Sequence, residues 1–459
     1  MKRCFVLLST VLLTLTATGQ SVSQRVATAY ESFEKDSQLR SAISSLYVVD
    51  AKSGAVVFEK NERIGLATAS TLKVITAASA YELLGKEFRY KTSFGYIGKI
   101  QGGRLLGDFL IQASGDPTFG SWRWKATRDT EILTEIGAAV KGLKISGYNG
   151  FVTNKKGWDS EAIPDGWMWQ DIGNYYGAGA DGFNWHENQF DIHLKSGASI
   201  GEPVTVAQTK PRLYGRTLRS LATTAAKGTG DNSYVYFPFS ENGGVIRGTI
   251  PAGENAFVIS AATPNPEQEF INRLRFEVMP ANNIGSFKYE GPRKDTTLIW
   301  SHYSPPLDSI NYYFLKRSIN LYGEALIKTI AYQRKGFAST DGGTEIVRSF
   351  WKEKGIDPVE LKLEDGSGLS PLNRVTTHAQ VQVLQYAQKQ SWFSGFLHGF
   401  PEYNGMKLKS GTISGVKGFC GYHTAKDGKQ YIVSFLVNNY NGSASRLVQK
   451  MYKVLDELK

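Results

Sequence analysis

A change in sequence character near residue 90, reversed near residue 291, constrains the fold more than any other feature. Between these points the chain is rich in glycine and aromatic residues, with short apolar stretches of strand length and little helical periodicity. Its length of roughly 200 residues is enough for one or two domains. We therefore predict that residues 91–291 form a β-rich insert in a domain built from residues 20–90 and 292–459.

The two flanking parts predict an antiparallel sheet with flanking helices, an α/β (α+β) arrangement. At the start, a turn at Lys52-Ser53-Gly54 separates two strand-like runs, which indicates a hairpin. A helix-like stretch follows and stops at Gly85. Expected strands are 43–50, 55–60, 406–413, 416–422 and 431–438, and expected helices are 71–84, 311–332, 376–390 and 443–458.

The first 19 residues are typical of a cleavable signal peptide. Lys2 and Arg3 precede a short apolar run over residues 4–15, and small residues follow at Ala17-Thr18-Gly19. An N-terminal anchor helix is the alternative, but the run is short for a bilayer. We expect an exported protein, periplasmic in location, with no transmembrane segment after cleavage. Cys420 would then be the only cysteine, which excludes an intramolecular disulfide in the mature chain.

Charge and histidine content exclude several function classes. The formal net charge of +11 favours attraction to an anionic wall polymer or lipid surface. The charges are interspersed and no nucleic-acid module is recognisable, so we expect no nucleic-acid partner. The six histidines are scattered, and His186-Glu187 lacks a second histidine at the helical spacing of a zinc hydrolase. We expect neither a metal site nor a cofactor.

Three short motifs occur in an order that predicts an active site: Ser70-Thr71-Leu72-Lys73, Ser318-Ile319-Asn320 and Lys409-Ser410-Gly411-Thr412. Each alone has an ordinary explanation. The first could be a helix cap and a solvated lysine, the second a pair of surface polar residues, and the third the end of a strand. Their joint occurrence, at the start of a helix, in a helical region and on a late strand, favours catalysis.

The chemistry of these residue types supports the grouping. A serine hydroxyl is a poor nucleophile until a base takes its proton, and residues three apart share one face of a helix, so Lys73 can reach Ser70. Lysine is a base near neutral pH only if its pKa falls from about 10.4, and burial together with a second cation, Lys409, would lower it. The backbone N–H groups of Ser70 and Thr412 are the expected oxyanion donors.

The motifs resemble those of the class C low-molecular-mass penicillin-binding proteins, the D-alanyl-D-alanine carboxypeptidase/endopeptidase family of peptidase S13. The resemblance covers nearly the whole mature chain. It also rests on the long gap between Lys73 and Ser318 and on the segments Ser114-Gly115-Asp116-Pro117-Thr118, Tyr175-Tyr176-Gly177-Ala178 and Asp365-Gly366-Ser367-Gly368-Leu369-Ser370. It implies a transpeptidase/β-lactamase-like fold, peptidoglycan stem peptides as substrates and β-lactams as inhibitors.

The same resemblance implies a role for each motif residue. Ser70 would be the acylated nucleophile and Lys73 its base, while Ser318 would relay the proton to the leaving amine. Asn320 would bind the substrate amide, and Lys409 would orient Ser318 and the substrate carboxylate, aided by Ser410 and Thr412. Gly411 is a further expected substrate-binding residue, and Asp116 would face the amine of the stem-peptide side chain. Ile319 and Ser410 replace the common Asp and Thr, and Pro371 stands where relatives often carry Arg, which puts side-chain recognition in question.

Other interpretations remain at this point. The same catalytic residues would suit a β-lactamase or esterase, and a non-catalytic wall-binding protein could use the insert alone. An aromatic cluster in the insert could stack on glycan rings, although such clusters more often form core, which we expect here. Its members are Trp167, Trp169, Tyr175, Tyr176, Phe183 and Trp185.

Overall fold

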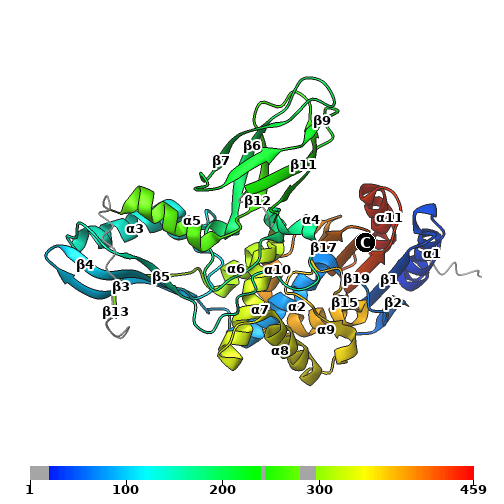
Figure 1. The fold of residues 1–459 in the computed structure, drawn as a ribbon. Coiled ribbons are helices and arrows are strands. Elements are labelled where there is room, and N and C mark those ends of the chain that lie inside the picture. The colour runs from blue at the N-terminus through cyan, green and yellow to red at the C-terminus, as the bar shows by residue number, and fades with distance from the viewer. Residues whose placement is uncertain (1–19, 239–242, 280–295) are drawn as a thin grey trace, which may run out of the picture.

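The computed structural model describes residues 20–238, 243–279 and 296–459 (Figure 1). The expected signal peptide, residues 1–19, lies outside the described residues. A central antiparallel sheet joins the two ends of the chain, because β1 pairs with β19. Its strands run in the order β16 (Glu402–Tyr403), β17 (Met406–Ile413), β18 (Val416–Thr424), β19 (Gln430–Asn438), β1 (Ile43–Asp50) and β2 (Val56–Lys60).

Helices cover both faces of the central sheet. Strand β1 is buried on both faces over its central residues, in agreement with the apolar run over residues 46–49. Leu46 and Val48 pack toward α1 (Val22–Glu34) and α11 (Ala444–Asp456), whereas Tyr47 and Val49 belong to the core on the opposite face. The predicted α/β (α+β) class, with an antiparallel sheet and flanking helices, is confirmed.

The opposite face carries the helices that build the active-site side of the molecule. They are α2 (Lys73–Leu84), α6 (Leu307–Lys316), α7 (Asn320–Lys335), α8 (Thr340–Glu353), α9 (Thr377–Gln388) and α10 (Phe393–His398), with the short strands β14 (Leu361–Lys362) and β15 (Arg374–Val375) nearby. The sequence predicted one helical stretch over residues 311–332. The structure divides it at Ser318, whose backbone is left-handed with φ 57°.

The first part of the insert is a sheet in the order β13 (Thr296–Tyr303), β3 (Lys91–Gln101), β4 (Arg104–Gln112) and β5 (Gly150–Asn154). The predicted insert ended at residue 291, which placed residues 296–303 with the catalytic part. In the structure these residues instead pair with β3, because β3 needs a hydrogen-bonding partner on the edge that β4 leaves open. The division into domains remains a prediction.

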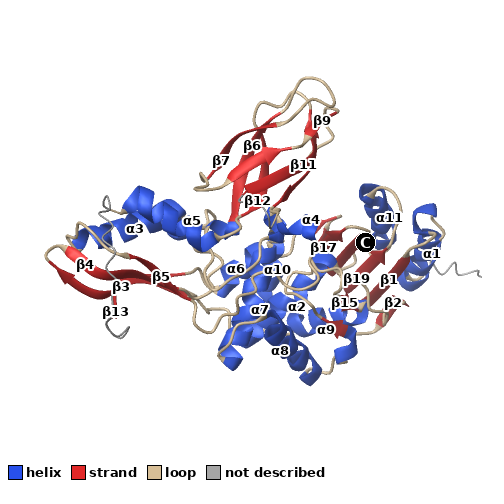
Figure 2. Ribbon diagram, viewed as in Figure 1, coloured by secondary structure: helices blue, strands red, loops and turns tan. Residues whose placement is uncertain are grey.

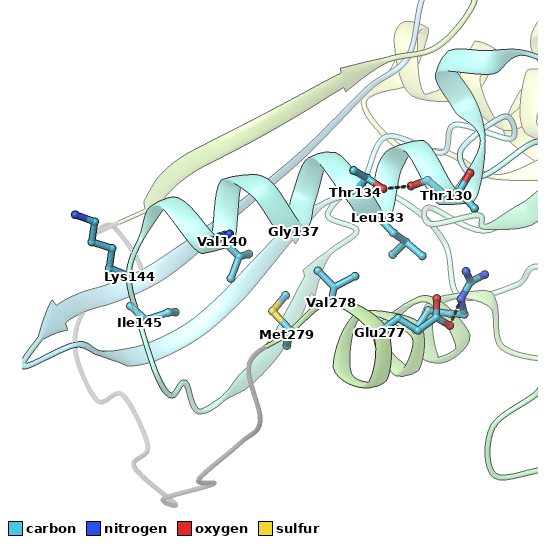
Figure 3. A pocket seen from close by; sticks show the side chains of 12 residues that line it. Thr130, Leu133, Thr134, Gly137, Val140, Lys144, Ile145, Glu277, Val278 and Met279 are labelled. Carbon is cyan, nitrogen blue, oxygen red and sulfur yellow. Dashed lines mark hydrogen bonds and ion pairs between the residues drawn. The ribbon is translucent and has the colours of Figure 1, made fainter.

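Helices α3 (Asp129–Gly142) and α5 (Pro266–Arg273) pack on this sheet, although the sequence suggested little helix there. Buried Ile132, Ile136 and Val140 form the helical stripe of α3. A cavity of about 670 Å³ lies between α3 and the residues after α5, where Leu133 and Val140 face Val278 and Met279 (Figure 3). No predicted site residue lines it.

The second part of the insert has its own core and its own sheets (Figure 2). One sheet has the order β12 (Phe257–Ala262), β6 (Gln189–Lys195) and β7 (Thr205–Lys210). The other has the order β10 (Asn232–Tyr236), β11 (Gly243–Pro251) and β8 (Thr217–Ser220), with β9 (Thr223–Ala225) also pairing with β11. The short helix α4 (Trp169–Ile172) lies between this part and the catalytic helices (Figure 1).

Candidate active site

A cavity of about 780 Å³ brings the three motifs together. Ser70, Ser318, Asn320 and Thr412 line it, although they come from widely separated parts of the sequence. The insert contributes further lining residues: Trp122, Arg123, Met168, Gln170, Asp171, Tyr175, Tyr176, Glu187, Gln189, Tyr234 and Ser260. The site is therefore shared between the catalytic elements and the insert.

Ser70 lies in a single 3₁₀ turn, Ala69–Leu72, that leads directly into α2. Two glycines allow other backbone segments to approach this turn closely. A Cβ on Gly411 would lie 2.6 Å from the carbonyl oxygen of Thr68 and 2.9 Å from the amide nitrogen of Ser70. A Cβ on Gly368 would lie 2.0 Å from the carbonyl oxygen of Ala69. Gly411, expected to bind substrate, thus places strand β17 against the serine.

Lys73 is completely buried and donates to three acceptors. Its Nζ lies 2.8 Å from Ser70 Oγ, 2.6 Å from Asn320 Oδ1 and 2.7 Å from the carbonyl oxygen of Ser367. Burial, and then the charge of Lys409, hold the pKa of Lys73 well below its ordinary value. Because the neutral amine has a lone pair, it can accept the Ser70 proton in this geometry.

Ser318 and Asn320 occupy the break between α6 and α7. Asn320 begins α7, and its side chain spans the junction with the insert. Its Oδ1 accepts from Lys73, while its Nδ2 donates to the carbonyl oxygen of Tyr176 at 2.7 Å. The left-handed backbone of Ser318 ends α6 and turns the chain so that residues 317–321 border the cavity.

Lys409 and Ser410 lie behind the cavity lining. Lys409 is buried, its Nζ donates to the carbonyl oxygen of Ser410 at 2.7 Å, and burial lowers its pKa to about 7. The hydroxyl of Ser410, an expected substrate contact, hydrogen bonds to the Tyr403 hydroxyl at 3.1 Å. Thr412, the next polar residue of β17, lines the cavity with Ser70, as the two expected oxyanion donors must.

Asp116 is not among the residues lining the cavity with Ser70. Its side chain is 2% exposed, and its Oδ1 accepts from the backbone and the hydroxyl of Thr118. Its Oδ2 is buried and has no hydrogen-bond partner among the residues that the structure describes. Burial raises the pKa of Asp116 to about 6. The expected role in substrate binding stays a prediction, one that this position does not favour.

The loop containing Asp365 holds one of the three acceptors of Lys73. The buried Asp365 carboxylate accepts from the amides of Gly368 and Ser370 and from the side chains of Trp167 and Asn373. Sequence reasoning noticed this segment only through its resemblance. The Ser367 carbonyl was missed because a backbone acceptor leaves no residue signature.

Glu324 supports the same loop from α7. Its Oε2 accepts from the Gly366 amide at 2.9 Å, and burial together with the Asp365 charge raises its pKa to about 8. The sequence gives no signal for this residue, which lies in the middle of a helix.

Glu187 is a buried acidic residue of the insert that lines the cavity. The sequence analysis did not identify it as a site residue. Its buried carboxylate accepts from Ser121 at 2.6 Å, from Arg123 at 2.7 and 3.0 Å and from the Tyr322 hydroxyl of α7 at 2.7 Å. It lies in a 3₁₀ turn where His186, Glu187 and Asn188 all have positive φ. The local sequence Trp185-His186-Glu187-Asn188 does not indicate this role.

The aromatic cluster of the insert divides into two groups. Trp167, Phe183 and Trp185 are buried, as the core interpretation expected. Trp169 and Tyr175 are 52% and 54% exposed, so that interpretation is wrong for them. Tyr175 and Tyr176 line the cavity instead.

Within the described ranges, none of the helices combines the length and the apolar character that crossing a bilayer requires.

Known proteins resemble this chain over most of its length. It is 26% identical to a D-alanyl-D-alanine carboxypeptidase of Actinomadura sp., covering 90% of this chain and 81% of that protein. It is 24% identical to the D-alanyl-D-alanine carboxypeptidase DacB of Haemophilus influenzae, covering 84% and 83% respectively.

The crystal structure of penicillin binding protein 4 (dacB) from Haemophilus influenzae has a similar fold, with a TM-score of 0.76 at 21% identity, covering 94% of this chain and 99% of that one. A structure of the same protein complexed with a β-lactam gives a TM-score of 0.69. Residues 26–458 match the model of one family, described as D-Ala-D-Ala carboxypeptidase 3 (S13). The chain therefore belongs to the D-Ala-D-Ala carboxypeptidase 3 (S13) family and is a serine-type hydrolase.

Proposed function

We propose that this protein is a serine D-Ala-D-Ala carboxypeptidase and DD-endopeptidase, and that it cleaves peptidoglycan stem peptides through an acyl-enzyme on Ser70. The observation that carries the proposal is the 2.8 Å contact between Ser70 Oγ and the Nζ of Lys73, a buried lysine with a lowered pKa. Family membership and the two carboxypeptidase relatives support this choice of substrate.

The proposed reaction has two halves. Neutral Lys73 takes the Ser70 proton as Oγ attacks the carbonyl between two D-amino acids, and the leaving amine receives a proton through Ser318. The tetrahedral oxyanion lies between the amides of Ser70 and Thr412, where losing one donor typically costs about 10²–10³ in rate. Water then attacks the ester carbon, which releases the shortened peptide and returns the proton to Ser70.

Asn320 and Lys409 complete the proposed machinery. Asn320 both holds Lys73 and lines the cavity, which supports a contact between its amide and the substrate peptide. Lys409 lies close enough to lower the pKa of Lys73, so it favours the neutral base. We also propose that β-lactams acylate Ser70, because they present a strained amide to the same residues. Export to the periplasm rests on the predicted signal peptide.

The decisive experiment is intact mass spectrometry of the mature protein after mixing with benzylpenicillin, beside Ser70→Ala. We expect a stable adduct on the wild type alone, together with release of D-alanine from a peptide ending in D-alanyl-D-alanine. Rapid loss of penicillin without peptide cleavage would favour a β-lactamase. An unmodified protein that leaves both compounds intact but binds sacculi would favour a wall-binding protein.

A further inference from the structure

Lys417, on strand β18, lies directly opposite Thr412 in the sheet. Its Nζ donates to Thr412 Oγ1 at 2.7 Å. Thr412 is exposed and lines the cavity together with Ser70, and the adjacent Gly411 packs against the backbone of the serine turn. The ammonium of Lys417 is therefore one hydroxyl away from the part of the cavity where the scissile carbonyl would lie.

The Lys417 ammonium differs from two neighbouring lysines, Lys407 on β17 and Lys429 in the turn between β18 and β19. Lys407 pairs with Glu402 at 3.7 Å, and Lys429 pairs with Asp427 at 3.4 Å. Lys417 is partly buried over the ring of Phe419, and in the described part of the chain no carboxylate pairs with it. Burial accordingly lowers its pKa. Lys417 is not itself a lining residue of the cavity, but its hydrogen bond to the lining residue Thr412 puts a partly desolvated cation one hydroxyl away from it. Such an arrangement is suited to an anionic ligand.

The other lysine of this region is less suited to that task. Lys409 is fully buried behind the lining, and its Nζ is directed to the carbonyl oxygen of Ser410. Lys417 also lowers the pKa of Lys409, which is about 7, so Lys409 is partly neutral near neutral pH. Of these two lysines, Lys417 is thus the one whose ammonium contacts Thr412 and is available to a ligand bound there.

We propose that Lys417, acting together with the Thr412 hydroxyl, binds the free carboxylate of the D-amino acid that the enzyme removes. The inference rests on the proposed function and extends it. In a peptide ending in D-alanyl-D-alanine, this carboxylate is separated from the scissile nitrogen by one carbon. A D-centred cross-link also retains such a carboxylate, whereas an internal peptide bond is followed by another amide. Lys417 therefore makes the enzyme selective for the bond next to a free carboxylate.

The test compares an acetylated peptide ending in D-alanyl-D-alanine with the same peptide carrying a C-terminal carboxamide. Three proteins are assayed: the wild type, Lys417→Gln and the matched control Lys407→Gln, which removes a lysine of the neighbouring strand that already has an acidic partner. We expect Lys417→Gln to lose about tenfold or more in kcat/KM for the free acid, mainly through KM, since hydrogen bonds between charged groups are the strong ones. Cleavage of the amide should be unchanged, and Lys407→Gln should behave as wild type.

A second pair of probes makes the result independent of peptide turnover. Acylation by benzylpenicillin, which has a free carboxylate, should slow in Lys417→Gln, whereas acylation by its methyl ester should not. Lys417→Arg should restore preference for the acid. The inference is overturned if Lys417→Gln keeps the wild-type ratio of acid to amide, or if both substrates decline equally. If wild-type protein neither cleaves the peptide nor forms a penicillin adduct, the proposed function itself fails.

Discussion

The hydroxyl of Tyr322 on helix α7 donates a 2.7 Å hydrogen bond to the buried carboxylate of Glu187 in the insert. Tyr322 is two residues beyond Asn320, which holds Lys73 and also donates to the carbonyl oxygen of Tyr176 in the insert. The insert thus contacts the first turn of α7 at two points. The insert thereby helps to position Asn320, which in turn holds Lys73.

Replacing Tyr322 with phenylalanine tests this coupling. The change removes one donor from a buried carboxylate, so we expect a loss of about 2 kcal/mol in unfolding free energy, measured by urea titration. Acylation by benzylpenicillin should slow several-fold, because the first turn of α7 loses one contact. Tyr90→Phe is the matched control: its buried hydroxyl bonds to Thr329 in the same helix, far along from Asn320. Equal acylation rates in the two variants would contradict the coupling.

The pH dependence of acylation should follow the charge on Lys73. Only the neutral amine can accept the Ser70 proton, so the rate should rise with pH as Lys73 loses its proton. Removing the Lys409 charge raises the pKa of Lys73, so the rising limb in Lys409→Gln should move to higher pH. The shift should be measured as the pH of half-maximal acylation rate, since the rate itself also falls. A limb that stays in place, or moves to lower pH, would exclude electrostatic coupling between the two lysines.

Asp116→Asn separates a structural role from a substrate-binding role. The folded-state pKa of about 6 exceeds the ordinary value near 4, so the folded protein holds this proton more tightly than the unfolded chain. Wild-type stability therefore falls as pH rises through this window, and the cost is fully present above it. We expect Asp116→Asn to be more stable than wild type by about 3 kcal/mol at pH 8, with the difference vanishing below about pH 3. If Asp116→Asn instead raises KM without changing stability, the predicted contact between Asp116 and the substrate amine would be supported.

Gly411→Ala should abolish acylation while leaving most of the fold intact. The added methyl group would lie within 3.0 Å of backbone atoms of Thr68, Ser70 and Thr71, so strand β17 must withdraw from the serine turn. A shift of this size moves Thr412 relative to Ser70, and misplacement of about 1 Å can cost 10²-fold in rate. Gly142→Ala is the control, because in the described part of the chain its added methyl group meets no atom within 4 Å. Circular dichroism and penicillin acylation of both variants are the measurements.

Most strands and helices around the site could be predicted from the sequence, because strongly apolar or periodic runs indicate secondary structure directly. Residues 43–50 and 406–413 form strands with the predicted bounds. Residues 311–332 were read as one helix because apolar spacing continues across Ser318, and periodicity does not reveal a left-handed residue. The pairing of residues 296–303 with β3 was not predicted, because most of the insert separates the two strands in the sequence.

The three candidate motifs could be identified in the sequence because serine, lysine and asparagine have distinctive chemistry at short spacing. The residues that hold them could not. Glu324 and Glu187 act as buried acceptors for backbone or tyrosine donors, and such roles depend on long-range packing rather than on neighbours in the sequence. Lys417 was missed for the same reason, since only the pairing of β17 with β18 places it opposite Thr412.

The pairing of β1 with β19 also affects when the active site can form during synthesis and folding of the chain. Ser70 follows β1 and β2 in the sequence, whereas β17, which packs against its turn, and β19, which pairs with β1, come much later and are therefore made later. Contacts between residues so distant in the chain form late in folding. A chain that stops before β17 therefore has the serine without its surroundings, so the proposed activity can arise only once the strands that come late in the sequence have been made and have paired.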